Sequence, residues 1–259
     1  MNQEERRRFL IEELLRERLS CRRQEIPADT DRQKVLLRSL MNVRHPGAIS
    51  QRFLEVQDAY LQGELAAKKI TRLSELSPLQ NGIYLWRGDI TTLDCGAIVN
   101  AANSGMTGCY QPCHNCIDNC IHTYAGVQLR LKCAEIMERQ GFEEPTGQAK
   151  ITPAYNLPCD YVIHTVGSIV QGKLTRQHCK LLESCYRSCL TLADENQVPS
   201  IAFCCISTGV FMFPNDKAAE IAVRTVQEYK AETGSKIEVI FNVFKEQDER
   251  IYSKLLRAD

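Results

Sequence analysis

Short β-prone runs alternate with helix-length segments from residue 83 onward, and this alternation constrains the fold more than any other feature. The β-prone runs lie at 83–86, 97–100, 149–152, 161–166, 200–205 and 236–244, and helical patterns fit at about 121–140, 176–196, 216–231 and 246–257. Strands that alternate with helices pair in a largely parallel sheet with helices on both faces. We therefore predict an α/β fold, a three-layer α/β/α sandwich around a mixed central sheet.

The N-terminal residues show helical patterns and no β-prone run. The first 20 residues carry one apolar stripe, formed by Leu10, Ile11, Leu14, Leu15 and Leu19. A second helix can begin at a cap formed by Asp29 or Thr30, and a third can begin after Ser50 and run to about Lys69. We therefore expect three helices before the first strand.

The chain length of 259 residues suits one core domain plus an extension better than two full domains. We predict an N-terminal helical extension over residues 1–75 and one α/β domain over residues 76–259. We expect the extension to cover one face of the sheet, and recognition of a partner protein is the alternative.

Charge and hydropathy exclude several classes of protein. Lys plus Arg and Asp plus Glu both number 32, so the chain lacks the basic excess with which proteins bind nucleic-acid phosphates. No apolar run is long enough for a signal peptide or a membrane span. We expect a cytoplasmic protein with reduced thiols and no nucleic-acid or membrane partner.

Four of the 13 cysteines fall within twelve residues, at 109, 113, 116 and 120, with His114 among them. Thiolates and imidazoles at such short spacing are the ligand types that zinc prefers. The segment has no distant Cys-x-x-Cys partner pair, which suits three protein ligands with an open fourth position, as in catalytic zinc sites. Spacing alone leaves open whether Cys113 or Cys120 also binds.

Two of the loops that follow predicted strands suit a phosphorylated sugar ligand. In open α/β sheets, ligands bind beyond the carboxyl ends of the strands. The small-residue loop 207–211 leaves backbone N–H groups free for a phosphate, although an ordinary connection capped by Asn215 or Asp216 is the alternative. The amides of Asn100 and Asn103 suit sugar hydroxyls, although a capped turn is the alternative.

Six motifs in sequence order resemble the ADP-ribosyl-hydrolase branch of the macrodomain family over about residues 75–259. They are GDIT at 88–91, IVNAAN at 98–103, IDNCIH at 117–122 with the following Ala-Gly at 125–126, PTG at 145–147, VIHTVG at 162–167 and STGVF at 207–211. The segment with Cys109, His114 and Cys116 resembles the zinc-containing subclass found in microbes, and the N-terminal helices resemble the extension of that subclass.

The resemblance implies an ADP-ribose site. Asp89, with Ile90 beside it, would accept a hydrogen bond from the adenine amino group, and Phe244 would stack on adenine. The loop Ser207, Thr208, Gly209, Val210 and Phe211 would wrap the diphosphate, with Phe211 under the distal ribose. Asn103 would hold the distal-ribose hydroxyls.

The resemblance also implies a zinc-assisted hydrolase that removes ADP-ribose from a modified protein. Cys109, His114 and Cys116 would bind Zn²⁺, and Asp118 and Asn103 would complete the site near the scissile bond. The protein substrate, by resemblance, could be a lipoyl-carrier protein.

Alternatives remain at this point. The chain could be an ADP-ribose reader with a structural zinc, or an O-acetyl-ADP-ribose deacetylase, and Asp118 could instead be a helix N-cap. His122 and His164 lie in apolar segments and are expected to be hydrogen-bonded core residues.

Two residues depart from the family pattern. Met212 stands where many relatives have Gly, which could alter how closely the loop approaches the distal ribose. Cys113 stands where Asn is common.

Overall fold

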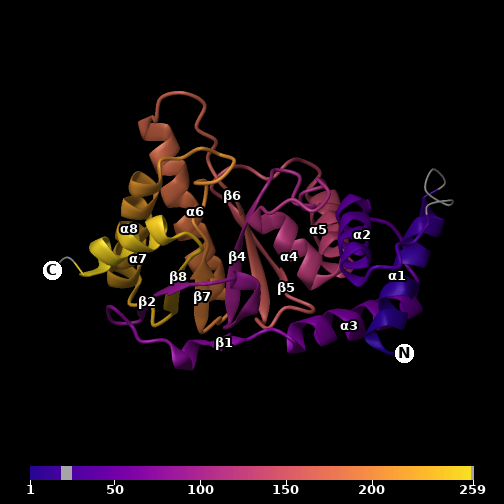
Figure 1. Cartoon of the computed structure of the whole chain (residues 1–259). Coiled ribbons are helices and arrows are strands. Elements are labelled where there is room, and N and C mark those ends of the chain that lie inside the picture. Colours follow the sequence, from indigo (N-terminus) through magenta and orange to yellow (C-terminus); the bar gives the residue numbers. More distant parts are fainter. Residues whose placement is uncertain (19–24, 258–259) are drawn as a thin grey trace.

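The computed structural model describes residues 1–18 and 25–257, and its centre is a six-stranded sheet (Figure 1). The strands are β2 (Ile83–Arg87), β4 (Ala97–Ala102), β5 (Ala149–Pro153), β6 (Tyr161–Val166), β7 (Ser200–Phe203) and β8 (Glu238–Val243). Their order is β2-β8-β7-β4-β6-β5. All neighbours pair in parallel except β5, which runs antiparallel to β6. The predicted mixed sheet is confirmed.

Helices cover both faces of this sheet (Figure 1). One layer holds α4 (Ile117–Ala125) and α5 (Val127–Gln140), and the other holds α6 (Arg176–Glu195), α7 (Asn215–Thr233) and α8 (Glu246–Arg257). All four residues of β7 are buried, because a central parallel strand has helices above and below it. The three-layer α/β/α architecture is therefore confirmed.

The extension is a three-helix bundle with an apolar core of its own. Its helices are α1 (Gln3–Glu17), α2 (Thr30–Val43) and α3 (Gln51–Ala66), and the side chains of Asn2, Asp29 and Ser50 cap their first turns. The first helix ends before residue 20, and Leu19 lies outside the described residues. A two-residue strand, β1 (Thr71–Arg72), then pairs with β3 (Leu93–Asp94).

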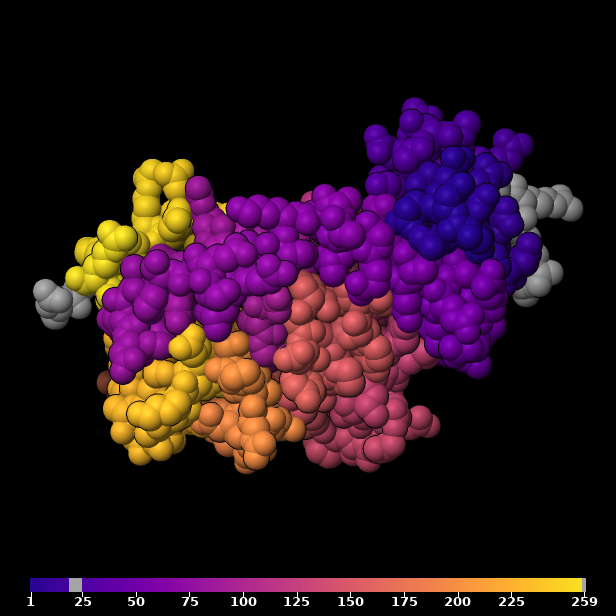
Figure 2. All heavy atoms as spheres, turned by 90° about the horizontal axis from the view of Figure 1, so that it is seen from below, coloured from indigo at the N-terminus to yellow at the C-terminus, as the bar shows by residue number. Residues whose placement is uncertain are grey.

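The extension packs on the α4–α5 layer, outside the face of the sheet that we expected it to cover. Its apolar core includes Val127 at the start of α5, and α2 contacts α4. The side-chain oxygen of buried Gln57 accepts a hydrogen bond from the Val127 N–H at 3.0 Å. The indigo and violet helices consequently form a lobe at one end of the molecule, far from the yellow C-terminal helix (Figures 1 and 2).

The single helix expected at 121–140 is two helices, α4 and α5, separated at Gly126. This glycine has a φ of 98°, which breaks the helical hydrogen-bond series and turns the chain. A Cβ atom there would lie 2.6 Å from the Gln57 side-chain nitrogen, so neither the backbone angle nor the space suits another residue.

Two strands end earlier than predicted, and one helix cap differs. β7 ends at Phe203 and β8 at Val243, because the chain leaves the sheet there to form the loops at its carboxyl edge. Pro214 occupies the N-cap position of α7 without a side-chain hydrogen bond. The proposed cap Asn215 is the first helical residue, and its amide donates instead to Asp248 at 2.6 Å.

No helix within residues 1–18 and 25–257 has both the length and the apolar character that a membrane crossing requires.

Candidate active site

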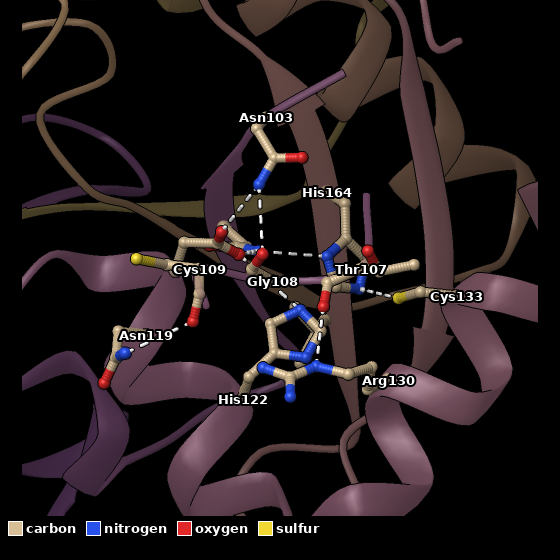
Figure 3. Close-up of polar contacts among 12 residues, drawn as sticks. Asn103, Thr107, Gly108, Cys109, Asn119, His122, Arg130, Cys133 and His164 are labelled. Carbon is tan, nitrogen blue, oxygen red and sulfur yellow. Dashed lines mark hydrogen bonds and ion pairs between the residues drawn. The ribbon is translucent and has the colours of Figure 1, made fainter. Parts of the chain in front are cut away.

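Asn103 and Asp118, which the sequence assigns to one site, are joined by a hydrogen bond. Asn103 follows β4, and its amide nitrogen donates to Asp118 Oδ2 at 3.3 Å and to the Gly108 carbonyl at 3.2 Å (Figure 3). Its amide oxygen accepts the Gly105 N–H at 3.0 Å. Asn103 therefore connects the end of a central strand to the helix that carries the carboxylate.

Asp118 is a buried carboxylate held by two asparagines. Its side chain is almost inaccessible, and Asn100 donates to its Oδ1 at 2.8 Å. Burial raises the pKa of Asp118 to about 6, although the hydrogen bonds from Asn100 and Asn103 and the charge of Arg130 lower it. A carboxyl group with such a pKa is suited to proton transfer near neutral pH.

Asp118 is not the helix N-cap that the alternative reading proposed. The N-cap of α4 is Cys116, whose sulfur accepts the Asn119 N–H at 3.4 Å. Asp118 lies inside the first turn, and its carboxylate points toward the end of β4.

Asn100 donates a hydrogen bond to Asp118 from the core side of β4, and it is too deeply buried to bind a sugar. Its side-chain nitrogen lies 3.1 Å from His164 Nδ1, so that ring nitrogen accepts and His164 Nε2 carries the proton toward Thr152 at 3.0 Å. His164 is thus the satisfied core histidine that we expected, and burial lowers its pKa to about 3.

His122 is buried as expected, but neither of its ring nitrogens has a hydrogen-bond partner within the described residues. Its Nε2 lies 3.5 Å from Asp118 Oδ1, beyond good hydrogen-bond range. Burial, with smaller contributions from His164 and Arg130, holds the pKa of His122 well below its usual range. The imidazole beside Asp118 is therefore neutral.

Cys109, His114 and Cys116 come together as the spacing predicts. Their ligand atoms all lie within 4.8 Å of one another, and Cys109 Sγ lies 3.7 Å from His114 Nδ1. Tetrahedral zinc places sulfur and nitrogen ligands about 3.5 Å apart, so small side-chain shifts suffice to bind it. Burial raises the pKa of Cys116 to about 12, and a bound divalent cation would reverse this by stabilising the thiolate.

Cys113 points away from these three residues. Its sulfur contacts the Val35 carbonyl of α2 at 3.5 Å, and its N–H donates to Asn42 at 2.9 Å. Its thiol therefore faces the extension.

We name the segment 104–116, which carries Cys109, His114 and Cys116, the metal loop.

A second group of ligand types, His122, Cys133 and His164, lies within 4.8 Å and is wholly buried. The guanidinium of Arg130 lies beside the His122 ring, since both would contact a Cβ atom built on Gly108. A divalent cation there would face a buried positive charge. The metal loop is the better cation site of the two.

The loop after β7 has strained backbone. Ser207 and Met212 both have positive φ angles, 67° and 55°, which residues other than glycine rarely adopt. The loop is closed by a hydrogen bond from the Phe213 N–H to the Ser207 carbonyl at 3.0 Å, and Thr208 and Phe211 lie partly exposed. The positive φ at Met212 is a conformation that glycine adopts more readily than methionine.

Asp89 and Phe244 lie at the ends of the neighbouring strands β2 and β8. The Gly88 N–H donates to the Val243 carbonyl at 3.1 Å, and the Phe244 ring is 76% exposed just beyond it. The Asp89 side chain is half-exposed, whereas Ile90 is in the core, so only the main chain of Ile90 is available to a ligand.

Several residues around the site come from distant parts of the chain and were missed in the sequence. Lys68 Nζ lies 3.7 Å from Asp89 Oδ2 and 3.9 Å from the centre of the Tyr124 ring. Arg38 and Arg130 contact the metal loop. No local pattern marks these three basic residues, because their partners lie far away in sequence.

Comparisons with known proteins identify the family and the fold. The Macro domain family model matches residues 99–222. A protein-ADP-ribose hydrolase of Treponema medium is 63% identical over 260 residues, covering 99% of this chain and 100% of the relative. A protein-ADP-ribose hydrolase of Staphylococcus aureus is 49% identical over 253 residues, covering 97% of this chain and 95% of the relative. The structure of a Trypanosoma brucei macrodomain in complex with ADP-ribose has a TM-score of 0.66 and 30% identity, covering 84% of this chain and 94% of that one.

Proposed function

Since the chain belongs to the protein-ADP-ribose hydrolase family of macrodomains, we propose that it is a mono-ADP-ribosyl hydrolase that cleaves the bond between ADP-ribose and a protein side chain. Cys109, His114 and Cys116 would hold a zinc ion beside Asp118 and Asn103. The substrate is an ADP-ribosylated protein, and by resemblance a lipoyl-carrier protein is a candidate.

One observation carries the proposal: the spatial order of the candidate groups follows the order of the parts of ADP-ribose. Across the sheet, β2 and β8 bring Asp89 and Phe244, β7 brings the loop 207–211, and β4 brings Asn103. Adenine, diphosphate and distal ribose follow one another in the same sequence. A single extended ligand along this edge would place its distal ribose between Asn103 and the metal loop.

The adenine and diphosphate ends supply binding. Asp89 offers a carboxylate to the adenine amino group, and the exposed Phe244 ring offers a stacking surface. Gly209 and Val210 at the tip of the strand-to-helix loop are exposed, so the backbone there is accessible to phosphate oxygens. Ser207 and Thr208 begin this loop, and Phe211 ends it near the ribose.

The ribose end supplies chemistry. Asp118, oriented by Asn100 and Asn103, accepts a proton from a water molecule whose oxygen bonds to the anomeric carbon. The bond from that carbon to the side-chain atom breaks with its electron pair, and the leaving group takes up the proton that Asp118 received, which regenerates the carboxylate. A bound zinc ion would supply Lewis acidity, either toward a ribose hydroxyl or toward the leaving group. Cleavage develops positive charge on the sugar ring, which the buried carboxylate stabilises.

The test is release of ADP-ribose from a labelled mono-ADP-ribosylated protein, measured with elemental analysis of the same preparation. We expect zinc to copurify and release to stop when a strong chelator removes it. An ADP-ribose reader would bind the nucleotide and release nothing. A deacetylase would act on O-acetyl-ADP-ribose and leave the modified protein intact, so both substrates are measured side by side.

A further inference from the structure

We propose that α2 of the extension holds the metal loop in the shape that binds zinc, through the positioning residues Arg38 and Asn42. The inference rests on the proposed function, because it concerns the zinc ligands Cys109, His114 and Cys116. It gives the N-terminal helices a role in the site itself.

The metal loop cannot fix its own shape. Residues 104–116 form no helix or strand. Met106, Gly108 and Cys113 have positive φ angles of 61°, 86° and 52°, and such a conformation is costly for Met and Cys. A loop of this kind keeps its geometry only when the surrounding structure enforces it.

Arg38 binds the loop at a zinc ligand. From α2, its Nη2 donates to the backbone carbonyl of His114 at 2.8 Å and to Asn119 Oδ1 at 3.0 Å. Asn119 in turn donates to the carbonyls of Cys109 and Gln111, at 3.3 and 3.0 Å. One guanidinium therefore fixes His114 directly and Cys109 through Asn119.

Asn42 binds the same loop one residue before His114. Its side-chain oxygen accepts the Cys113 N–H at 2.9 Å, and its nitrogen donates to Thr123 of α4 at 2.9 Å. Asn42 is buried, so these two hydrogen bonds are shielded from water. They hold Cys113 in its left-handed conformation, with its thiol turned toward α2.

Arg130 of α5 secures the beginning of the loop to the end of α2. Its Nε donates to the Thr107 carbonyl at 2.7 Å, and its Nη1 lies 2.6 to 3.0 Å from three carbonyls at the C-terminus of α2. A cation is favourable at that position because helix carbonyls carry partial negative charge there. The guanidinium also lies under the Tyr110 ring, which stacks on His45. α2 thus holds the loop directly near His114, and through Arg130 near Thr107.

Such support raises metal affinity because the ligands are ordered before the metal arrives. Ordering a flexible loop on binding subtracts from the binding free energy, and partners that orient ligands typically change metal affinity 10–100-fold when removed. We expect Arg38→Met to weaken Zn²⁺ binding about tenfold. Arg38→Lys, which keeps the charge and a terminal donor, should restore part of the loss.

The experiment measures Zn²⁺ affinity by competition with a chromophoric chelator, and hydrogen exchange of the metal-free protein. The full chain is compared with Arg38→Met, Arg38→Lys and the matched control Arg32→Met, an exposed arginine on the same helix. We expect faster exchange in residues 107–116 of Arg38→Met than in the full chain or Arg32→Met, and an intermediate rate in Arg38→Lys. Should Arg38→Met fail to fold, Asn42→Ser is measured in the same way.

Wild-type Zn²⁺ affinity and wild-type exchange in Arg38→Met and Asn42→Ser would overturn the role of α2. A wild-type chain that takes up no Zn²⁺ would instead remove the metal from the proposed function, and with it this role. The two failures are therefore distinguishable.

Discussion

The amide nitrogen of Asn103 lies 3.3 Å from Oδ2 of Asp118, although 15 positions separate the two residues in the chain. The intervening metal loop is folded back so that both its ends meet at the carboxyl end of β4. A buried carboxylate, an amide and three candidate metal ligands thereby share one corner of the sheet.

Asp118→Ala should lower ADP-ribose release by about 10²–10⁴-fold, the usual contribution of a general base, while ADP-ribose binding persists. Turnover of a labelled acceptor and calorimetric titration with ADP-ribose measure the two quantities. Asp160→Asn, an exposed carboxylate before β6, is the control and should change neither. Unchanged turnover in Asp118→Ala would remove this residue from the mechanism.

Variants of Cys109, Cys116, Cys113 and Cys133 should differ in the amount of zinc that copurifies with them. Cys109→Ser and Cys116→Ser should copurify with much less zinc, because each removes one of three ligands. Cys113→Ser should retain it, because that thiol contacts the Val35 carbonyl. Cys133→Ala should retain zinc too, because the positive charge of Arg130 disfavours a cation at the buried group that contains Cys133. Elemental analysis decides, and zinc loss in Cys113→Ser would contradict the assignment.

Phe244→Ala should weaken ADP-ribose binding about 10–100-fold, since base–aromatic stacking contributes about 1–3 kcal/mol. The free energy of unfolding should hardly change, because the ring is 76% exposed. Phe244→Tyr keeps a stacking surface and should bind normally. Phe142→Ala removes another exposed ring and serves as the control. Calorimetric titration measures the affinities, and normal binding by Phe244→Ala would place adenine elsewhere.

The free energy of unfolding should fall as the pH falls below 6.5, in part because of His164. Burial lowers the pKa of His164 from 6.5 to about 3. Between these two pH values, His164 is protonated in the unfolded chain and neutral in the folded protein. The contribution of His164 is complete above pH 6.5 and is lost toward pH 3, at up to about 1.4 kcal/mol per pH unit.

Urea unfolding of His164→Gln measures this slope. The variant should be less stable at pH 7.5, because the bonds to Asn100 and Thr152 change, yet its stability should fall less steeply between pH 6.5 and 4.5. An equally steep fall in His164→Gln would show that this imidazole is not the responsible group.

The sheet and its helices could be predicted because their signals are local. Apolar runs such as 161–166 matched β6, and the caps Asp29 and Ser50 marked two helix starts. The break at Gly126 was missed, since a lone glycine in a helical pattern is often tolerated. The early ends of β7 and β8 were also missed, because they are set by where the following loops leave the sheet and no local sequence signal marks that point.

The candidate metal ligands could also be proposed from their spacing and from the family motifs, because the three side chains lie within eight residues. The residues that support them could not be found in this way. Arg38 is 76 positions from His114, and Arg130 is 89 positions from Met41. Hydrogen bonds over such separations exist only once the bundle has docked on α4 and α5.

The anchoring of the metal loop to α2, directly and through Arg130, has a consequence for protein engineering. Transplanting residues 104–116 into a macrodomain without the N-terminal bundle would transfer the candidate ligands without the contacts that hold them in place. A working transplant would need the stretch from Val35 to His45 as well, together with the arginine on α5 that joins the two. Here the unit that can be moved between proteins is two segments far apart in the gene, with the α5 arginine that joins them.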